Sequence, residues 1–375
     1  MIAPPPFREV PPLVAAESLP VHASVLLYGA GNVGRDLLRV LRASGADVRA
    51  FLDRRAAPGQ AVDGSPVLHP GSGSLAPSER KLPVVLSLFN RGIDVPALAS
   101  ELQRLGFESI VSFVDIHSRF PRELGDRFWL TGREIYEREA GTIAEAEGLF
   151  ADEASRAFYR GMVWFRRTGD YSRLAPQQDV AIQYVPTDVP GWPPPGPLRL
   201  IDCGAYDGDT IESLHAGGLR IEAAAAFEPE AASFLALAAK VRSWPLERRT
   251  DLALWPCGVG AATGLVSFQT GNGESSRVSA DGGGTISVVA LDDVLSGFRP
   301  TLVKMDIEGA EPGALEGMKG IAREFRPALA VCVYHCPDHL WEIPRLIDGW
   351  GLGYRFFLRG HSEDGFDWVL YAVPA

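Results

Sequence analysis

Short apolar runs alternate with segments of helical spacing along two long parts of the sequence. In the first part, apolar runs predict strands at residues 25–28, 48–52, 82–88 and 109–114. Between them, apolar residues on one helical face predict helices at residues 35–42 and 95–105. Strands that alternate with helices in this way favour a Rossmann-like α/β domain with a parallel sheet, which we place at residues 21–118.

The second alternating part begins after the proline cluster at residues 192–197 and reaches the C-terminus. Strands are predicted from residue 198 and at residues 223–227, 252–256, 302–305, 328–334, 354–358 and 368–373. Helices are predicted at residues 210–216, 230–241, 312–318 and 340–350. A short loop with Asp364 and Gly365 joins the last two strands, so they should form an antiparallel hairpin that caps an otherwise parallel sheet.

The length of 375 residues fits two domains of roughly 150 residues or a little more. The segment between the two alternating parts carries periodic apolar residues among charges, which predicts a mainly helical linker. A polar, glycine-rich section at residues 260–289 has a hairpin-like pattern. We therefore expect a flexible arm at residues 1–20, a Rossmann-like domain at 21–118, a helical linker at 119–196 and a second α/β domain at 197–375.

Composition and charge narrow the classes of partner. The chain has a formal charge of −11 and no cluster of Lys and Arg, which argues against nucleic acid as the ligand. No apolar run approaches the ~20 residues of a membrane-spanning helix, and the four scattered cysteines do not form a secreted disulfide framework. The N-terminus lacks the features of a signal peptide, so we expect a cytoplasmic protein with small-molecule partners. The apolar positions of the linker leave a homo-oligomer open.

Polar residues gather where the predicted strands of the second domain end. They lie at residues 202–209, 228, 306–311 and 335. Ligands of open α/β sheets bind beyond the carboxyl ends of the strands. Gly204 and Gly208 would allow close approach to the backbone, and Glu228, about 20 residues later, could accept both hydroxyls of a ribose. The first loop has no P-loop lysine, so the pattern indicates a nucleoside ligand rather than a phosphate cradle.

Four motifs of the second domain together resemble the FkbM family of S-adenosylmethionine-dependent methyltransferases. They are DCGAYDGDT at residues 202–210, FEP at 227–229, VVALDDVL at 288–295 and VKMDIEGAE at 303–311. The resemblance covers roughly residue 151 to the C-terminus and implies a seven-stranded sheet with an antiparallel last strand. It also implies a site for the methionine and ribose parts of S-adenosylmethionine, built from Asp202, Gly204, Ala205, Tyr206, Asp207, Gly208, Thr210, Glu228 and Asp306. Tyr206 stands where many methyltransferases outside this family have glycine.

Methyl transfer to a sugar hydroxyl requires a base or a metal, because the hydroxyl pKa lies far above 7. His335 is our first choice as the base. Asp306 and Glu308 would shape the acceptor pocket or hold a divalent cation, and Arg359 and His361 could reach the same mouth. The predicted enzyme is therefore an O-methyltransferase whose acceptor is a sugar or a glycosylated small molecule.

Each of these residues also has a simpler interpretation. Asp306 and Glu308 could cap the following helix, and His335 could be a structural histidine. The spacing of Cys332, His335 and Cys336, with His339 nearby, is compatible with zinc, but buried thiols are the better interpretation, and we predict no metal-ligand residues here, while a divalent cation as cofactor stays open.

The first domain carries its own glycine loop, with Gly29, Gly31 and Gly34, and an acidic residue, Asp53, about 20 positions later. The loop resembles the nucleotide-sugar-binding N-terminal domains of certain sugar acyltransferases, and equally a minimal NAD-binding half. We favour binding of a nucleotide sugar or other substrate, which would aid acceptor binding, or a degenerate domain with a structural role. The alternatives are an NAD(P)-dependent oxidoreductase or nucleotide-sugar-binding protein that uses this loop, and a non-catalytic protein that binds S-adenosylmethionine without transferring its methyl group.

Overall fold

The computed structural model describes residues 9–20, 22–73, 75–245, 251–269, 277–278 and 284–375. The chain divides into two compact units. The first comprises Met1–Gly141, Ala157–Pro176 and Ser362–Phe366, and the second comprises Thr142–Arg156, Gln177–His361 and Asp367–Ala375. The segment predicted as a linker thus contributes to both units. Among the described residues, no helix combines the length and apolar character needed to cross a bilayer.

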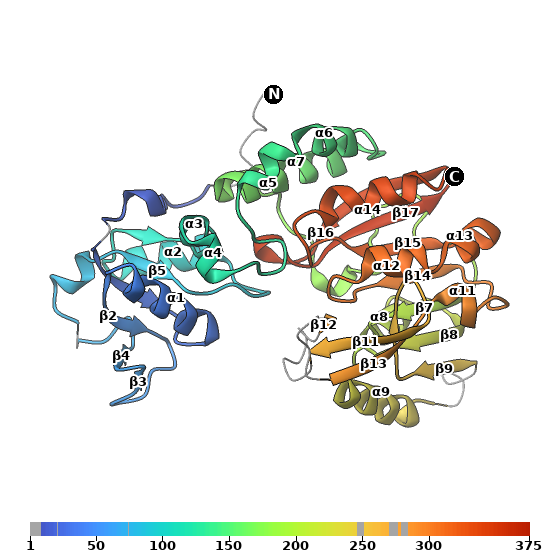
Figure 1. Cartoon of the computed structure of the whole chain (residues 1–375), viewed down its shortest axis with the longest axis horizontal. Helices are drawn as coiled ribbons and strands as arrows, with labels where there is room; N and C mark the ends of the chain where they lie inside the picture. Colours follow the sequence, from blue (N-terminus) through green and yellow to red (C-terminus); the bar gives the residue numbers. More distant parts are fainter. Residues whose placement is uncertain (1–8, 21, 74, 246–250, 270–276, 279–283) are drawn as a thin grey trace. The chain divides into compact units, whose positions relative to one another are not determined.

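The first unit contains a six-stranded sheet with the order β3-β4-β2-β1-β5-β6 (Figure 1). Its elements are β1 (Ser24–Tyr28), α1 (Asn32–Ala43), β2 (Asp47–Leu52), β3 (Ala61–Val62), β4 (Ser65–Leu68), β5 (Val84–Leu86), α2 (Val95–Arg104) and β6 (Ile110–Val111). All pairs are parallel except β3 with β4. Because β1 lies between β2 and β5, the strand order reverses at its carboxyl end, where the glycine loop follows.

One predicted strand of this unit is shorter than expected. The apolar run at residues 109–114 gives only the two residues of β6, because Ser112 accepts a hydrogen bond from the backbone N–H of Asp115 and caps a helix. The helices that follow are α3 (Phe113–Arg119), α4 (Pro121–Leu124), α5 (Glu134–Arg138), α6 (Ala140–Glu147) and α7 (Glu153–Thr168). The predicted helical character of this region is confirmed.

The second unit contains a seven-stranded sheet with the order β16-β17-β15-β14-β7-β8-β9. Its strands are β7 (Leu198–Cys203), β8 (Ile221–Phe227), β9 (Leu252–Trp255), β14 (Leu302–Met305), β15 (Ala328–Cys332), β16 (Tyr354–Gly360) and β17 (Trp368–Pro374). β17 runs antiparallel to both β15 and β16, and the other pairs are parallel. The predicted α/β class and the antiparallel last strand are therefore confirmed.

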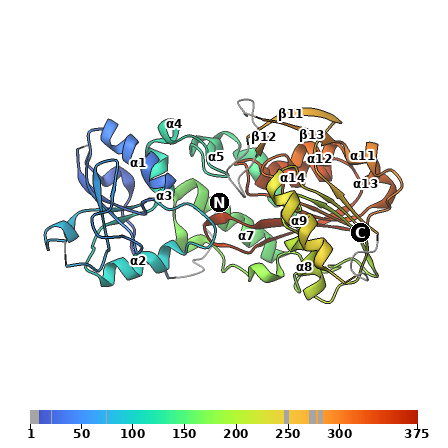
Figure 2. The ribbon, with the colours of Figure 1, turned by 90° about the horizontal axis from the view of Figure 1, so that it is seen from below.

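Helices cover both faces of this sheet. They are α8 (Asp209–Ala216), α9 (Ala231–Ser243), α12 (Glu311–Glu316), α13 (Lys319–Phe325) and α14 (His339–Asp348). Right-handed crossovers that move outward from β7 and β14 in opposite directions place their helices on opposite faces, and Figure 2 shows α8 on one side of the strands with α12 and α14 on the other. The loops after β7, β8, β14 and β15 consequently meet at one edge.

The glycine-rich section forms a small four-stranded sheet with the order β10-β13-β11-β12. Its strands are β10 (Gly258–Val259), β11 (Gly264–Gln269), β12 (Arg277–Val278) and β13 (Gly284–Val289), followed by α11 (Leu291–Val294). β11 pairs antiparallel with both β12 and β13, as the hairpin-like pattern predicted. Residues 270–276 and 279–283 of this section lie outside the described residues.

Candidate active site

The loop after β7 is shaped by close contact with the end of β14. Gly204 has a φ of +78°, and a Cβ placed on it would lie 2.0 Å from the backbone oxygen of Asp306. The backbone N–H of Asp306 donates to the Cys203 carbonyl at 3.1 Å. Only glycine allows this approach, which brings two of the sequence motifs together.

Asp202 forms a buried ion pair with a residue that the sequence analysis did not single out. Lys304 on β14 is its register partner, and the Lys304 ammonium lies 3.1 Å from Asp202 Oδ1. The ammonium also donates to the Gly204 carbonyl at 2.5 Å. Burial raises the pKa of Asp202 to about 6, although Lys304 acts to lower it. Burial alone would lower the pKa of Lys304, but Asp202 and Asp306 raise it above its usual value.

Two buried oxygen atoms of this loop have no hydrogen-bond partner within the described part of the chain. They are Asp202 Oδ2 and Thr210 Oγ1, on side chains that are almost completely buried. Buried polar groups in folded proteins are normally satisfied by protein, water or ligand. Asp202 Oδ2 and Thr210 Oγ1 are therefore available to form hydrogen bonds with a polar ligand bound at this loop.

Glu228 connects the β7 and β8 loops. Its Oε2 accepts a hydrogen bond from the backbone N–H of Tyr206 at 2.9 Å, and its Oε1 accepts one from Glu230 at 2.7 Å. Burial raises the pKa of Glu228, while these two hydrogen bonds act to lower it. Each carboxylate oxygen has a second lone pair, so the side chain can hold Tyr206 in its left-handed conformation, φ +45°, and still accept hydroxyls.

The turn after β14 is closed by Glu311, the first residue of α12. Glu308 and Gly309 adopt left-handed conformations, with φ of +56° and +103°. The fully buried Glu311 carboxylate accepts hydrogen bonds from the backbone N–H groups of Ile307 at 2.9 Å and Gly309 at 3.1 Å. The turn therefore depends on one side chain as well as on glycine.

His335 lies between carboxylates on both sides of its ring. Nδ1 is 2.8 Å from Glu311 Oε1, and Nε2 is 3.1 Å from Asp306 Oδ1 and 3.8 Å from Glu308 Oε2. Burial lowers the pKa of His335, but the charges of Glu311 and Asp306 raise it well above its usual value. Ionised carboxylates only accept hydrogen bonds, so this arrangement requires a proton on each ring nitrogen.

Asp306 is the carboxylate on which several groups converge. The hydroxyls of Tyr334 and Tyr184 donate to its Oδ1 and Oδ2 at 3.3 and 3.5 Å. The side chains of Asp306 and Glu308 are each 18% exposed, whereas His335 is 1% exposed and Glu311 is fully buried. The accessible part of the cluster is thus the pair of carboxylates, with the histidine beneath them.

Comparison with known proteins identifies this region. Residues 202–356 match the family described as "Methyltransferase FkbM domain". The second unit carries an FkbM methyltransferase domain. No curated protein matches the chain.

One solved structure matches nearly the whole chain. The crystal structure of methyltransferase FkbM from Methylobacillus flagellatus KT is similar with a TM-score of 0.74 and 22% identity, over 93% of this chain and 90% of that one. At this identity the similarity shows a shared fold. The methyltransferase domain of bacterial CtHen1-CN matches 47% of this chain and 89% of its own at 15% identity. Its TM-score of 0.27 does not indicate a shared fold.

Most predicted residues of the methyltransferase domain lie at the shared strand edge, and three have contacts with other segments. Asp207 pairs with Lys240 of α9 at 2.8 Å. Arg359 is buried against Asp152 and Asp188, at 2.9 and 2.7 Å. Burial lowers the pKa of His361 to about 4, and its Nε2 lies 2.8 Å from the hydroxyl of Tyr371.

The cysteines of the methyltransferase domain support the buried-thiol interpretation. Cys203, Cys257 and Cys332 are buried, and Cys336 is half-buried. Within the described residues, no group of three or more His, Cys, Asp or Glu side chains has the arrangement of a metal site.

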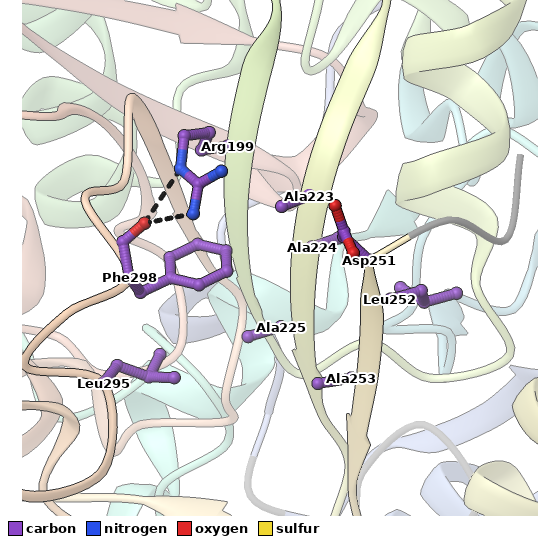
Figure 3. Close-up of a pocket in the computed structure, with 9 residues that line it drawn as sticks. All are labelled: Arg199, Ala223, Ala224, Ala225, Asp251, Leu252, Ala253, Leu295 and Phe298. Carbon is purple, nitrogen blue, oxygen red and sulfur yellow. Dashed lines mark hydrogen bonds between the residues drawn. The ribbon is translucent and has the colours of Figure 1, made fainter.

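A pocket lies at the other end of the same sheet (Figure 3). Its floor consists of the small side chains of Ala223, Ala225 and Ala253, and the Arg199 guanidinium donates to the Phe298 carbonyl at its rim. Arg199 stands near the amino end of β7, so this pocket is separate from the strand edge that holds Asp202.

In the first unit, the glycine loop is tightly built. A Cβ on Gly34 would lie 2.2 Å from the carbonyl oxygen of Gly29, so α1 can begin this close only with glycine there. Asp53 accepts hydrogen bonds from the backbone of Ala30 at 3.3 Å and Arg55 at 2.8 Å. Asp53 therefore connects the carboxyl end of β2 to the loop. A Cβ placed on Gly31 would have no other atom within 4 Å, so this position does not require glycine for space.

Proposed function

We propose that the chain is an S-adenosylmethionine-dependent O-methyltransferase that acts on a hydroxyl of a sugar or a glycosylated small molecule. The main support is the pair of partly exposed carboxylates, Asp306 and Glu308, next to the Asp202 loop in a methyltransferase domain. A partly exposed carboxylate pair suits an acceptor that donates hydrogen bonds.

The cofactor would lie over the loop at residues 202–210. When bound, S-adenosylmethionine supplies a methyl group activated by its positive sulfonium. Glu228 would accept the ribose hydroxyls, and the unsatisfied oxygens of Asp202 and Thr210 fit a polar ligand at this loop. Lys304 would keep the Gly204 carbonyl and Asp202 in place beneath it.

The acceptor proton would go to Asp306 or Glu308. The sequence pattern favours His335 as the base. Its contacts with Asp306 and Glu311 instead favour a proton on each ring nitrogen, so His335 is not free to accept the acceptor proton. In this proposal Asp306 accepts the proton, while His335 and the two tyrosine hydroxyls orient its carboxylate. His335 then acts by positive charge and position.

The net negative charge of the carboxylates around His335 limits which acceptors can bind beside them. Asp306, Glu308 and Glu311 contribute three negative charges, and His335 offsets one of them. A phosphate or carboxylate beside these groups would be repelled at close range. We therefore propose that the part of the acceptor beside this cluster is polyhydroxylated and either uncharged or positively charged.

A transfer assay tests this proposal. The protein is incubated with methyl-labelled S-adenosylmethionine and a panel of neutral, amino and phosphorylated sugars and glycosides, and products are examined for a new O-methyl signal by NMR. Label in the hydroxyl of a neutral or amino sugar supports the proposal. Transfer to an amine or a carboxylate instead would contradict the predicted O-methylation.

A role for the first unit is a second part of the proposal. Its glycine loop lies where the strand order reverses beside β1, with Asp53 at the end of β2, which is the position of nucleotides in related folds. We propose that it assists acceptor recognition by binding a nucleotide-linked group. Titration with NAD, NADP and nucleotide sugars separates this role from the oxidoreductase alternative, because only the latter predicts tight nicotinamide binding.

A further inference from the structure

We propose that Glu311 is a positioning residue that acts through His335 to orient the Asp306 carboxylate toward the acceptor hydroxyl. This inference rests on the proposed function. Glu311 was not among the residues predicted for the site, and it is too deeply buried to contact an acceptor itself.

The first step of the argument is the set of contacts around Glu311. Its Oε1 lies 2.8 Å from His335 Nδ1 and accepts from the Ile307 backbone, and its Oε2 accepts from the Gly309 backbone and lies 3.4 Å from His339 Nδ1. The residue thereby connects the turn after β14 to the segment after β15. A buried carboxylate needs such partners, because an unpaired charge in the interior is costly.

The second step concerns the charged groups that surround His335 and keep it protonated. Asp306 and Glu308 face His335 from the turn after β14, Glu311 faces it from α12, and His339 on α14 lies behind Glu311. On its own segment the Tyr334 ring lies 4.1 Å from the His335 ring, centroid to centroid, with Cys336 adjacent in sequence. The carboxylates outnumber the cationic groups, so His335 retains its proton and presents Nε2–H to Asp306.

The third step is the chemistry at Asp306. Its Oδ1 receives His335 and Tyr334, which leaves Oδ2, with Tyr184 at 3.5 Å, as the oxygen better placed for an acceptor. In the transfer, an acceptor oxygen lone pair forms the new O–C bond and the C–S electrons remain on sulfur, giving a neutral thioether. The hydroxyl proton passes to Asp306 and later to solvent. Glu311 and His335 exchange no proton.

Glu311→Gln tests this chain of contacts while keeping the shape of the side chain. The protein is labelled with ¹⁵N-histidine, and long-range ¹H–¹⁵N spectra are followed from pH 5.5 to 9, with the His335 signals assigned by His335→Gln. We expect His335 to remain doubly protonated at pH 8 in the wild type and to become neutral at least one pH unit lower in Glu311→Gln. Glu316→Gln, an exposed position on the same helix, should leave the titration unchanged.

Transfer and binding measurements complete the test. Affinity for S-adenosylhomocysteine should change less than about threefold in Glu311→Gln, while transfer should fall by about 10²-fold with an altered pH profile. If Glu311→Gln does not fold, Glu311→Asp serves in its place, and we expect its transfer to decline at a lower pH than in the wild type, as His335 becomes neutral. A neutral His335 in the wild type at pH 7, or identical titrations in both proteins, would overturn the inference. Absence of S-adenosylhomocysteine binding to the wild type, with the expected titrations, would instead overturn the proposed function.

Discussion

Lys304→Met removes the ammonium that faces the buried Asp202 carboxylate while preserving most of the side-chain volume. In the wild type the two groups are 3.1 Å apart, with side chains 4% and 0% exposed. Removing one partner of such a pair leaves an uncompensated buried charge, which typically costs about 3–5 kcal/mol. The Gly204 carbonyl also loses its donor. For a domain of roughly 150–250 residues, this corresponds to a fall in midpoint temperature of roughly 6–20 °C.

The loss of stability in Lys304→Met should also depend on pH. Because burial raises the pKa of Asp202 to about 6, the folded state binds a proton more tightly than the unfolded state, and Asp202 destabilises the fold above pH 6. That penalty is relieved as the pH falls from 6 toward 4. Without Lys304 the penalty increases, so the difference between Lys304→Met and the wild type should be largest above pH 7 and shrink toward pH 5.

The assay is thermal unfolding of both proteins between pH 5 and 8, followed by near-UV circular dichroism. Asp202→Asn combined with Lys304→Met removes both charges and should recover most of the lost stability, because neutral buried pairs avoid the charge penalty. Lys319→Met, which breaks an exposed ion pair with Glu316, serves as the control for a lysine-to-methionine change. A loss below about 1 kcal/mol at pH 8, or a loss independent of pH, would refute the reasoning.

Two further changes test separate parts of the site. Asp306→Asn should lower methyl transfer, measured by single-turnover kinetics, by about 10²–10⁴-fold. The affinity for S-adenosylhomocysteine, measured by calorimetry, should stay nearly unchanged. Equal losses of transfer and of affinity would contradict a role of Asp306 in proton transfer. Gly204→Ala places a Cβ 2.0 Å from the Asp306 backbone oxygen at a φ of +78°. We therefore expect weaker cofactor binding and a free energy of unfolding that is lower by about 2 kcal/mol or more, measured by thermal unfolding. Wild-type values of both would contradict the close contact of the two loops.

The positions of the strand-end residues were predictable because apolar runs mark where buried strands stop. Asp202 and Glu228 follow such runs directly, and both lie at the shared edge of the sheet. The antiparallel last pair was also predictable, since a short loop joins two adjacent apolar runs. These features depend on local patterns alone.

The residues that were missed act through contacts between distant segments. Lys304 sits inside an apolar run, and only the parallel register of β14 with β7 reveals that it faces Asp202. Glu311 looks like an ordinary acidic residue at a helix start, but the fold places His335, from the segment after β15, against it. Asp207, Arg359 and His361 also have partners on distant segments, and these contacts could not be predicted from local patterns.

The most direct test of the central claim is calorimetry of S-adenosylmethionine and S-adenosylhomocysteine binding to the whole protein. We predict micromolar binding to the wild type, a loss of at least about tenfold in Glu228→Ala, and unchanged binding in Glu222→Ala, an exposed position near the start of the same strand. Binding of neither compound to the wild type, or equal binding to Glu228→Ala, would contradict the account of this site.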